Sequence, residues 1–321
     1  MNPKPRLILP TCTLRFRNAA QRYLQTPFFT RSLCLLAYQP THAMTLLSSF
    51  EWSWLWTFAA LLTLGLVTGF LAGLLGIGGG MVMVPFLTYL ISQQGVGSAL
   101  AVKMAIATSM ATIVFTSLSS VRAHHKKGAV RWDIVRGLTP GIVVGALIAS
   151  LGVFSVMKGT TLAFVFAGFV GFSSLQMFRN KQPQPSRMLP SPPGLAGAGG
   201  VIGFASGLVG AGGGFISVPF MAWCNVAIHQ AVATSAALGF PIALANAVGY
   251  VWSGQQVNNL PAGAIGYIYM PALAIIAIAS MCTAPLGAQA AHALPVAKLK
   301  RVFATLLLGL AVYMAYKGLA A

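Results

Sequence analysis

One long stretch without charge constrains this chain more than any other feature. After Glu51, no Asp, Glu, Lys or Arg occurs until Lys103, a run of 51 residues. As a single α-helix this run would be about 75 Å long, whereas the hydrocarbon core of a bilayer is about 30 Å thick. The run is therefore predicted to lie in a membrane and to turn there at least once.

The composition extends this conclusion to the whole chain. Of 321 residues, 57% are hydrophobic and 7% are charged, and the mean hydropathy is +0.79, which is far more apolar than a soluble domain requires. We predict an all-α, polytopic membrane protein with about eight transmembrane helices. The expected spans are 54–75, 98–122, 133–153, 159–179, 195–210, 229–252, 264–290 and 299–319. Two apolar pieces, 81–91 and 215–225, are too short to cross and are predicted to be re-entrant or half helices.

The charge is one-sided, with 20 Lys and Arg against two acids and a net charge of +18. The basic residues fall mainly in gaps between spans, at 122–136 and 179–187, as expected for loops on the cytoplasmic side of a membrane rather than for a nucleic-acid surface. With a cytoplasmic amino terminus, however, the basic cluster at 298–301 would lie outside. Four scattered cysteines have no metal-binding spacing, so neither a metal nor another cofactor is predicted.

An internal repeat organises the chain. GFLAGLLGIGGGMVMVPF (69–86) recurs 134 residues later as GFASGLVGAGGGFISVPF (203–220), with 11 of 18 positions identical, and KMAIATS (103–109) aligns with HQAVATS (229–235) at an offset of 126. The predicted organisation is a basic extension (1–50), a first transmembrane repeat (51–180), a Pro-rich cytoplasmic linker (181–194) and a second repeat (195–321). Met44 is an alternative start that would exclude most of the extension. Four spans per half predict parallel copies, whereas odd counts would invert them.

The glycines of the motif suggest two roles. Those at 69, 73, 76 and 80, and at 203, 207, 210 and 214, share one helical stripe and favour close helix packing. Three consecutive glycines in each copy weaken a helix by about 1 kcal/mol each and predict a break, to which Pro85 and Pro219 are also assigned. The helix after a break would aim free N–H groups at a cavity, which is a binding site for an anion. The predicted substrate-binding glycines are Gly78, Gly79, Gly80, Gly212, Gly213 and Gly214.

Polar side chains near the breaks complete the predicted site. Further substrate-binding candidates are Thr108, Ser109, Thr234, Ser235 and Asn246. Alternatively, the hydroxyls bond carbonyls one turn back in their own helices. Lys103 and His229 are expected either to attract the anion or to reach toward the membrane interface. With only Glu51 and Asp133 as acids, a buried carboxylate relay is excluded. Proton coupling would need histidines, Na⁺ coupling would need hydroxyls and carbonyls, and uncoupled transport is also feasible.

The doubled G-x-x-x-G-x-x-G-x-GGG-x-x-x-V-P motif, each copy followed by an A-T-S span, resembles the sulfite exporter TauE/SafE family over about residues 50–320. The carboxyl end, APLGAQAAHALPVAKLKRVFATLLLGLAVYMAYKG, is also similar to this family, whereas the extension 1–43 departs from its pattern. The resemblance implies a bacterial inner-membrane, multi-pass permease that exports sulfite or a small organosulfur anion. The repeated helix break, the hydroxyl residues and the lack of buried acids predict transport by alternating access between the two repeats. Its expected partners are a small anion and membrane lipids, without nucleic acid. A permease for an unrelated solute and a non-transporting subunit are alternatives. No catalytic constellation is present, so an enzyme is not predicted.

Overall fold

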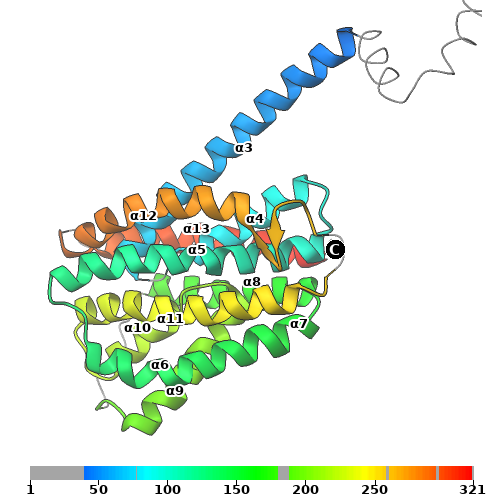
Figure 1. Ribbon diagram of the computed structural model, residues 1–321. Helices are drawn as coiled ribbons and strands as arrows, with labels where there is room; N and C mark the ends of the chain where they lie inside the picture. The colour runs from blue at the N-terminus through cyan, green and yellow to red at the C-terminus, as the bar shows by residue number, and fades with distance from the viewer. Residues whose placement is uncertain (1–39, 77, 180–187, 258–259, 294–295, 320–321) are drawn as a thin grey trace, which may run out of the picture. The chain divides into compact units, whose positions relative to one another are not determined.

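The computed structural model describes residues 40–76, 78–179, 188–257, 260–293 and 296–319. The chain divides into two compact units, Met1–Trp56 and Thr57–Ala321. In the first unit, the described residues form the start of helix α3 (Pro40–Leu75). Most of the predicted basic extension lies outside the described residues. The rest of α3 and all other described elements belong to the second unit (Figure 1).

The second unit is almost entirely helical. Its elements after α3 are α4 (Gly80–Gln93), α5 (Ser98–Lys126), α6 (Trp132–Leu147), the π-helix η2 (Ile148–Val153), α7 (Phe154–Val156), α8 (Gly159–Arg179), α9 (Pro192–Val209), α10 (Gly214–Trp223), α11 (Ile228–Gly254), β1 (Ala264–Ile265), β2 (Ile268–Tyr269), α12 (Met270–Ala293) and α13 (Val296–Leu319). Within the described residues, eight helical segments are long and apolar enough to cross a membrane, while α4 and α10 are shorter. The predicted all-α polytopic fold is confirmed.

One predicted span begins too early. Residues 264–269, expected to open the span 264–290, form an antiparallel hairpin, and α12 starts at Met270. Gly263 and Gly266 have φ angles of +85° and +55°, which glycine adopts readily and which end regular helix. The stretch is apolar, so hydropathy alone did not separate it from the helix that follows.

Long helices α5 and α11, the ATS helices of the two repeats, lie side by side and run in opposite directions (Figure 1). Near the start of α5, Lys103 contacts the ring of Phe154, which packs 4.5 Å from Tyr250 late in α11. Just beyond the end of α5, the Arg131 amide donates a hydrogen bond to Thr234 near the start of α11. Equivalent helices of the two repeats are therefore antiparallel.

The other helices follow the same pattern. Helix α12 runs parallel to α5, because Tyr269 meets Thr108 and Ser280 meets Thr116 farther along both. Its equivalent in the first repeat, α6, runs parallel to α11 and so opposite to α12. Arg131, just before α6, bonds Thr234 near the start of α11, and Ser150, just beyond α6, meets Gly249 late in α11. The prediction of parallel repeats is wrong, because α4 and α10 turn back at the breaks and run opposite to the parts of α3 and α9 that lead into them, which gives each repeat an odd number of passes.

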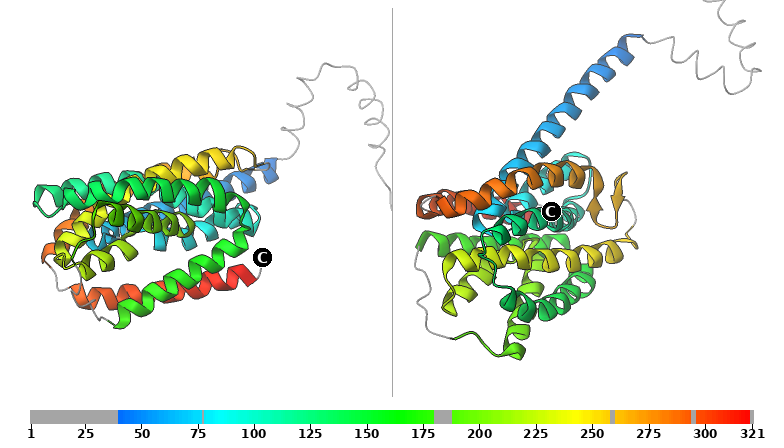
Figure 2. Two further views of the ribbon diagram at one scale, coloured as in Figure 1. Left: turned by 90° about the horizontal axis from the view of Figure 1, so that it is seen from below. Right: turned by 60° about the vertical axis from the view of Figure 1, so that its left-hand side comes forward.

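The inverted arrangement gathers the basic loops at one end of the second unit, which we call the basic end. Helix α5 ends there with His124, His125 and Lys126, and α8 ends there with Arg179. Helix α13 is antiparallel to α8, since Ser174 bonds Ala304 while Gly318 meets Phe164, so Arg301 near its start lies at the same end. The two helices form a pair (Figure 2). The expectation that the cluster around Arg301 would lie on the opposite side is therefore wrong.

Part of the predicted glycine stripe packs helices closely. A methyl group on Gly69 or Gly73 of α3 would collide with the backbone of α12 at Ser280 or Ala284. Gly76 does not continue this stripe, because α3 ends at Leu75 and Gly76 has a φ of +68°. The close packing of α3 on α12 therefore depends on glycine as far as Gly73. At the break, glycine instead supplies positive φ angles.

Candidate functional site

Each repeat contains a break made by glycines with positive φ. In the first, φ is +68° at Gly76, +78° at Gly78 and +72° at Gly79; in the second, it is +73° at Gly210 and +76° at Gly213. L-residues with a side chain rarely adopt these angles. Gly79 and Gly213 are the residues that precede α4 and α10. Pro85 and Pro219, predicted to belong to the break, lie inside α4 and α10 instead.

The two breaks meet in the interior. A methyl group on Gly78 would lie 3.1 Å from the Cα atom of Gly212, and one on Gly80 would collide with the carbonyl oxygen of Gly210. Backbone therefore packs against backbone where the two copies of the motif cross, at the contact of Gly78 and Gly80 with Gly210 and Gly212, which we call the junction. The sequence predicted two breaks, and the structure brings them together.

Serines of the ATS segments tie each break to the opposite repeat. Ser109 of the first repeat donates a 2.7 Å hydrogen bond to the carbonyl of Gly210, and Ser235 of the second donates a 2.9 Å bond to the carbonyl of Gly76. Both serines are fully buried. These two bonds are related by the internal repeat, and they satisfy carbonyls that a broken helix leaves without intrahelical partners.

The neighbouring threonines also bond across the repeats. Thr108 accepts a 3.0 Å hydrogen bond from the amide of Tyr269, just before α12, and Thr234 accepts a 3.0 Å bond from the amide of Arg131, just before α6. Ser109 and Ser235 therefore do not bond carbonyls one turn back, because both donate across the repeats, whereas the two threonines are seen here as acceptors. All four predicted hydroxyl residues lie at the junction between the repeats.

Helices α4 and α10 begin at this junction and run away from it in opposite directions. The amides of Val82 and Met83 bond the Gly79 carbonyl, and those of Ile216 and Ser217 bond the Gly213 carbonyl. Within the described chain, the amides of Gly80 and Gly214 have no backbone partner. The two helices thus place their N-termini, with their partial positive charges, next to the breaks where the repeats meet.

Asn246 lies deeper in the second repeat. Its Nδ2 donates to the carbonyl of Ile242 one turn back, while its buried Oδ1 has no hydrogen-bond partner within the described residues. The Oγ of Ser206 is likewise buried and without a described partner. An added methyl on Gly207 would meet Asn246, and one on Gly213 would lie 3.0 Å from Ser206. Sequence analysis did not select Ser206, which aligns with Ala72 and so shows no repetition.

Lys103 and His229 are not brought together. Lys103 is half-buried, donates a 3.1 Å hydrogen bond to the Ser155 carbonyl, and lies 5.6 Å and 5.5 Å from the ring centres of Phe154 and Tyr267. His229 is exposed near the start of α11, at the basic end. Because the repeats are inverted, these equivalent positions lie at opposite ends of the fold.

A small cavity lies beside the first break. It is lined by Ala72, Gly76, Gly78, Thr116, Ser117, Ser120, Ser235, Ala236 and Gly239, and its volume is about 10 Å³, enough for about one water-sized particle. Ser120 is buried, and its Oγ has no hydrogen-bond partner within the described residues. Sequence analysis missed Ser120, although it aligns with Asn246 at the offset of 126 found for the ATS segments.

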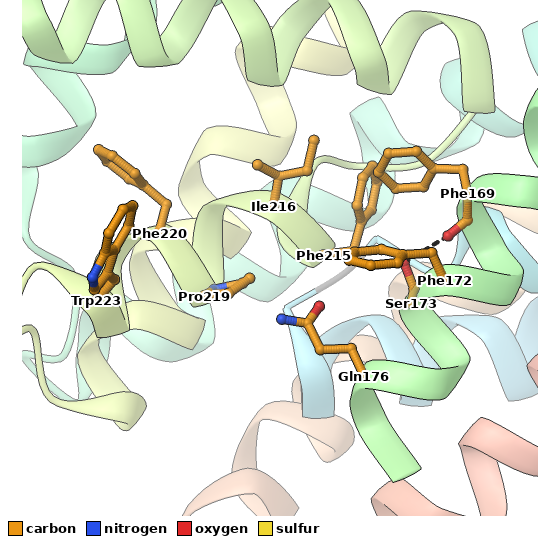
Figure 3. Close-up of a pocket in the computed structure, with 9 residues that line it drawn as sticks. All are labelled: Phe169, Phe172, Ser173, Gln176, Phe215, Ile216, Pro219, Phe220 and Trp223. Atoms are coloured by element: carbon orange, nitrogen blue, oxygen red, sulfur yellow. Dashed lines mark hydrogen bonds between the residues drawn. The ribbon is translucent and has the colours of Figure 1, made fainter. Parts of the chain in front are cut away.

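A larger, open cavity of about 520 Å³ lies between α8 and α10 (Figure 3). Aromatic side chains dominate its lining, and the rings of Phe169 and Phe215 meet edge to face at 4.4 Å. Ser173 and Gln176 supply polar groups on α8. This lining offers few donors to an anion, so the junction of the breaks remains the better candidate site.

Comparisons with known proteins agree with this architecture. Residues 61–314 match the model of the family described as "Sulfite exporter TauE/SafE". A "Probable membrane transporter protein" of Haemophilus influenzae is 37% identical over 257 residues, which is 80% of this chain and 97% of the relative. A "Probable membrane transporter protein" of Methanocaldococcus jannaschii is 25% identical over 246 residues, which is 74% of this chain and 87% of the relative.

The "Probable membrane transporter protein YunE" of Bacillus subtilis is 31% identical over 65% of this chain and 83% of its own length. No solved structure matches the chain. The family match covers most of the chain, including both glycine breaks and both ATS segments. The chain therefore belongs to the sulfite exporter TauE/SafE family and is a multi-pass membrane transporter.

Proposed function

We propose that the protein exports a small oxyanion, sulfite or an organosulfonate, across the bacterial cytoplasmic membrane. The observation that carries this proposal is the meeting of the two glycine breaks, Gly78 against Gly212 and Gly80 against Gly210, from which helices α4 and α10 begin. Paired amide groups and helix dipoles bind an anion without any charged side chain. The six motif glycines, the four ATS hydroxyl residues and Asn246 are the proposed substrate-contacting set.

The charge pattern gives an orientation, with the basic end in the cytoplasm, and the membrane potential supports export. Positively charged loops remain on the cytoplasmic side during membrane insertion. An inside-negative potential then favours anion exit by about 2.3 kcal/mol per charge per 100 mV. Lys103 would lie toward the external end and His229 toward the cytoplasmic end, where each would raise the local concentration of the anion. The sulfur-containing substrate class rests on the family match.

Transport requires the junction to open. Ser109 and Ser235 close it by bonding the opposite break, and the cavity at Gly78 has a volume of only about 10 Å³. Alternating access would therefore separate the two repeats at these bonds, first on one side and then on the other. Inverted repeats suit this motion, because either repeat can adopt the conformation of the other.

Flux of labelled sulfite and sulfoacetate through proteoliposomes tests the proposal, with uncharged mannitol as the comparison solute. We expect efflux of the anions that increases with an inside-negative potential. Absence of anion movement under every imposed potential, pH gradient and Na⁺ gradient would exclude the function, and equal mannitol flux would indicate a permease for unrelated solutes.

Glycine variants connect this flux to the site. Gly80→Ala places a methyl group against the Gly210 carbonyl, and Gly78→Ala introduces a side chain at a φ of +78°. We expect both to reduce anion flux at least about tenfold, equivalent to about 1.4 kcal/mol. Gly168→Ala is the matched control, because nothing lies within 4 Å of its added methyl. Size-exclusion chromatography verifies that each variant is folded. If folded Gly80→Ala and Gly78→Ala proteins had wild-type flux, the breaks would not be part of the transport site.

A further inference from the structure

We propose that the small cavity beside the first break binds one Na⁺ ion. The cavity lies where α3 ends, between α5 of the first repeat and α11 of the second. Four hydroxyl residues line it: Thr116, Ser117, Ser120 and Ser235. This inference rests on the proposed function only where it concerns coupling to anion transport, since ion binding can be measured alone.

The hydroxyl hydrogens determine which kind of ligand fits. Ser117 donates to the carbonyl of Val114, and Ser235 donates to the carbonyl of Gly76. Thr116 lies 3.1 Å from the Thr112 carbonyl and 2.7 Å from the Ser280 hydroxyl, so its hydrogen is also used within the protein. A hydroxyl has one hydrogen and two lone pairs, so these three groups offer the cavity acceptors rather than donors. In this closed arrangement such a lining suits a cation and disfavours an anion, and the Ser235 hydroxyl becomes a donor for the anion only when its bond to Gly76 opens.

Ser120 provides the independent observation that points to a ligand. Its side chain is 2% exposed and lines the cavity, and its Oγ has no hydrogen-bond partner in the described structure. A buried polar atom without a partner is unfavourable and uncommon in native proteins. A cation coordinated by Ser120 Oγ would satisfy this atom and use the lone pairs of its neighbours.

Charge and size select a monovalent ion. The lining residues are all uncharged, whereas Ca²⁺ sites rely on carboxylates. The carboxyl end of α3 contributes the partial negative charge of its helix dipole and the carbonyl of Gly76. A volume of about 10 Å³ accepts one ion of the size of water. Hydroxyls and carbonyls at a broken helix are ligands that Na⁺ uses in membrane transporters.

The position of the site couples the ion to the closed junction. Ser235 lines the cavity and holds the Gly76 carbonyl across the repeats, so an ion here bridges α3, α5 and α11. Bound Na⁺ would stabilise the closed arrangement, and its release would favour opening. Exchange of entering Na⁺ for departing anion is the direction that an inward Na⁺ gradient would drive.

The test is thermal unfolding of the purified full chain, with NaCl replaced by KCl or choline chloride at constant ionic strength. We expect a saturable rise in Tm that is specific for Na⁺. Ser120→Ala should raise the half-maximal Na⁺ concentration about tenfold or more, as loss of a metal-site contact commonly does. In choline chloride this variant should be at least as stable as the wild type, because it removes an unpartnered buried hydroxyl.

Ser92→Ala is the matched control. The Ser92 hydroxyl is also buried without a described partner, but it lies on α4 outside the cavity, so its removal should leave the Na⁺ response unchanged. Thr116→Val is a second cavity variant and should weaken the response like Ser120→Ala. An equal Tm rise in KCl, no Na⁺-specific rise, or an unchanged response of Ser120→Ala would overturn the proposal and leave water as the occupant.

Flux measurements keep the two proposals separate. Na⁺-specific stabilisation without any anion flux would retain the ion site and reject the proposed function. Anion flux without Na⁺-specific stabilisation would retain the proposed function and reject the ion site.

Discussion

At the scale of residues, the reciprocal serines do most to define the candidate site. Ser109 and Ser235 occupy equivalent positions in the two repeats, and each donates to a carbonyl of the opposite break. Sequence analysis predicted both residues and assigned them to the substrate, with an intrahelical carbonyl as the alternative. It could not identify the observed partners, because they lie 101 and 159 residues away in sequence and depend on the direction of the repeats.

Replacing these serines tests their contribution to stability. Ser109→Ala leaves the buried carbonyl of Gly210 without this donor, and we expect a loss of about 1–3 kcal/mol. Ser235→Ala should lose at least as much, since Ser235 also accepts a bond from Ser217. The measurement is the midpoint of unfolding in SDS. Ser155→Ala, which removes an exposed hydroxyl bonded within its own helical segment, should change stability by less than about 0.5 kcal/mol. Equal effects of all three changes would contradict the structural role of the crossed bonds.

At the scale of elements, hydropathy was sufficient to find the helices. Seven of the eight spans were predicted to within a few residues of their start, because a bilayer imposes long apolar segments. The start of α12 was misplaced because the apolar hairpin before it has the same hydropathy as a helix. The direction of α4 and α10 was not predicted either, because the length of a short apolar helix does not say whether it continues across the membrane or returns.

The packing of α6 on α9 gives a prediction for an element pair. A methyl group on Gly141 of α6 would collide with the carbonyl of Ala196 on α9. We expect Gly141→Ala to separate the helices and lower the yield of monodisperse protein in fluorescence-detected size-exclusion chromatography. Gly197→Ala, on α9 itself, is the control, since nothing lies within 4 Å of its added methyl and alanine favours helix by about 1 kcal/mol. A normal yield for Gly141→Ala would show that this contact tolerates a wider spacing.

At the scale of the whole second unit, the inverted repeat explains the charge pattern. The basic residues at the end of α5, Arg179 at the end of α8 and Arg301 near the start of α13 share one end, as the positive-inside rule expects of cytoplasmic loops. Counting each broken helix as one crossing had put Arg301 on the other side. The internal repeat was readable from the sequence, but its direction required the structure.

Cysteine accessibility tests this topology. In a variant without native cysteines, single cysteines replace Lys127 after α5, Gln94 before α5 or Gln255 after α11, which are all exposed. A membrane-impermeant maleimide applied to whole cells should label Gln94→Cys and Gln255→Cys, and should label Lys127→Cys only after the membrane is opened. Lys127 and Gln255 each follow the ATS helix of their repeat, so labelling of Lys127→Cys and Gln255→Cys from the same side would contradict the antiparallel repeats.

The crossed bonds between the repeats also have a genetic consequence. Each half supplies the hydroxyl that satisfies the break of the other, so a half expressed alone would leave its own buried carbonyl without a donor. Two chains separated between α8 and α9 would each carry what the other lacks. The halves should therefore complement one another in trans when co-expressed, whereas neither should accumulate in the membrane without its counterpart.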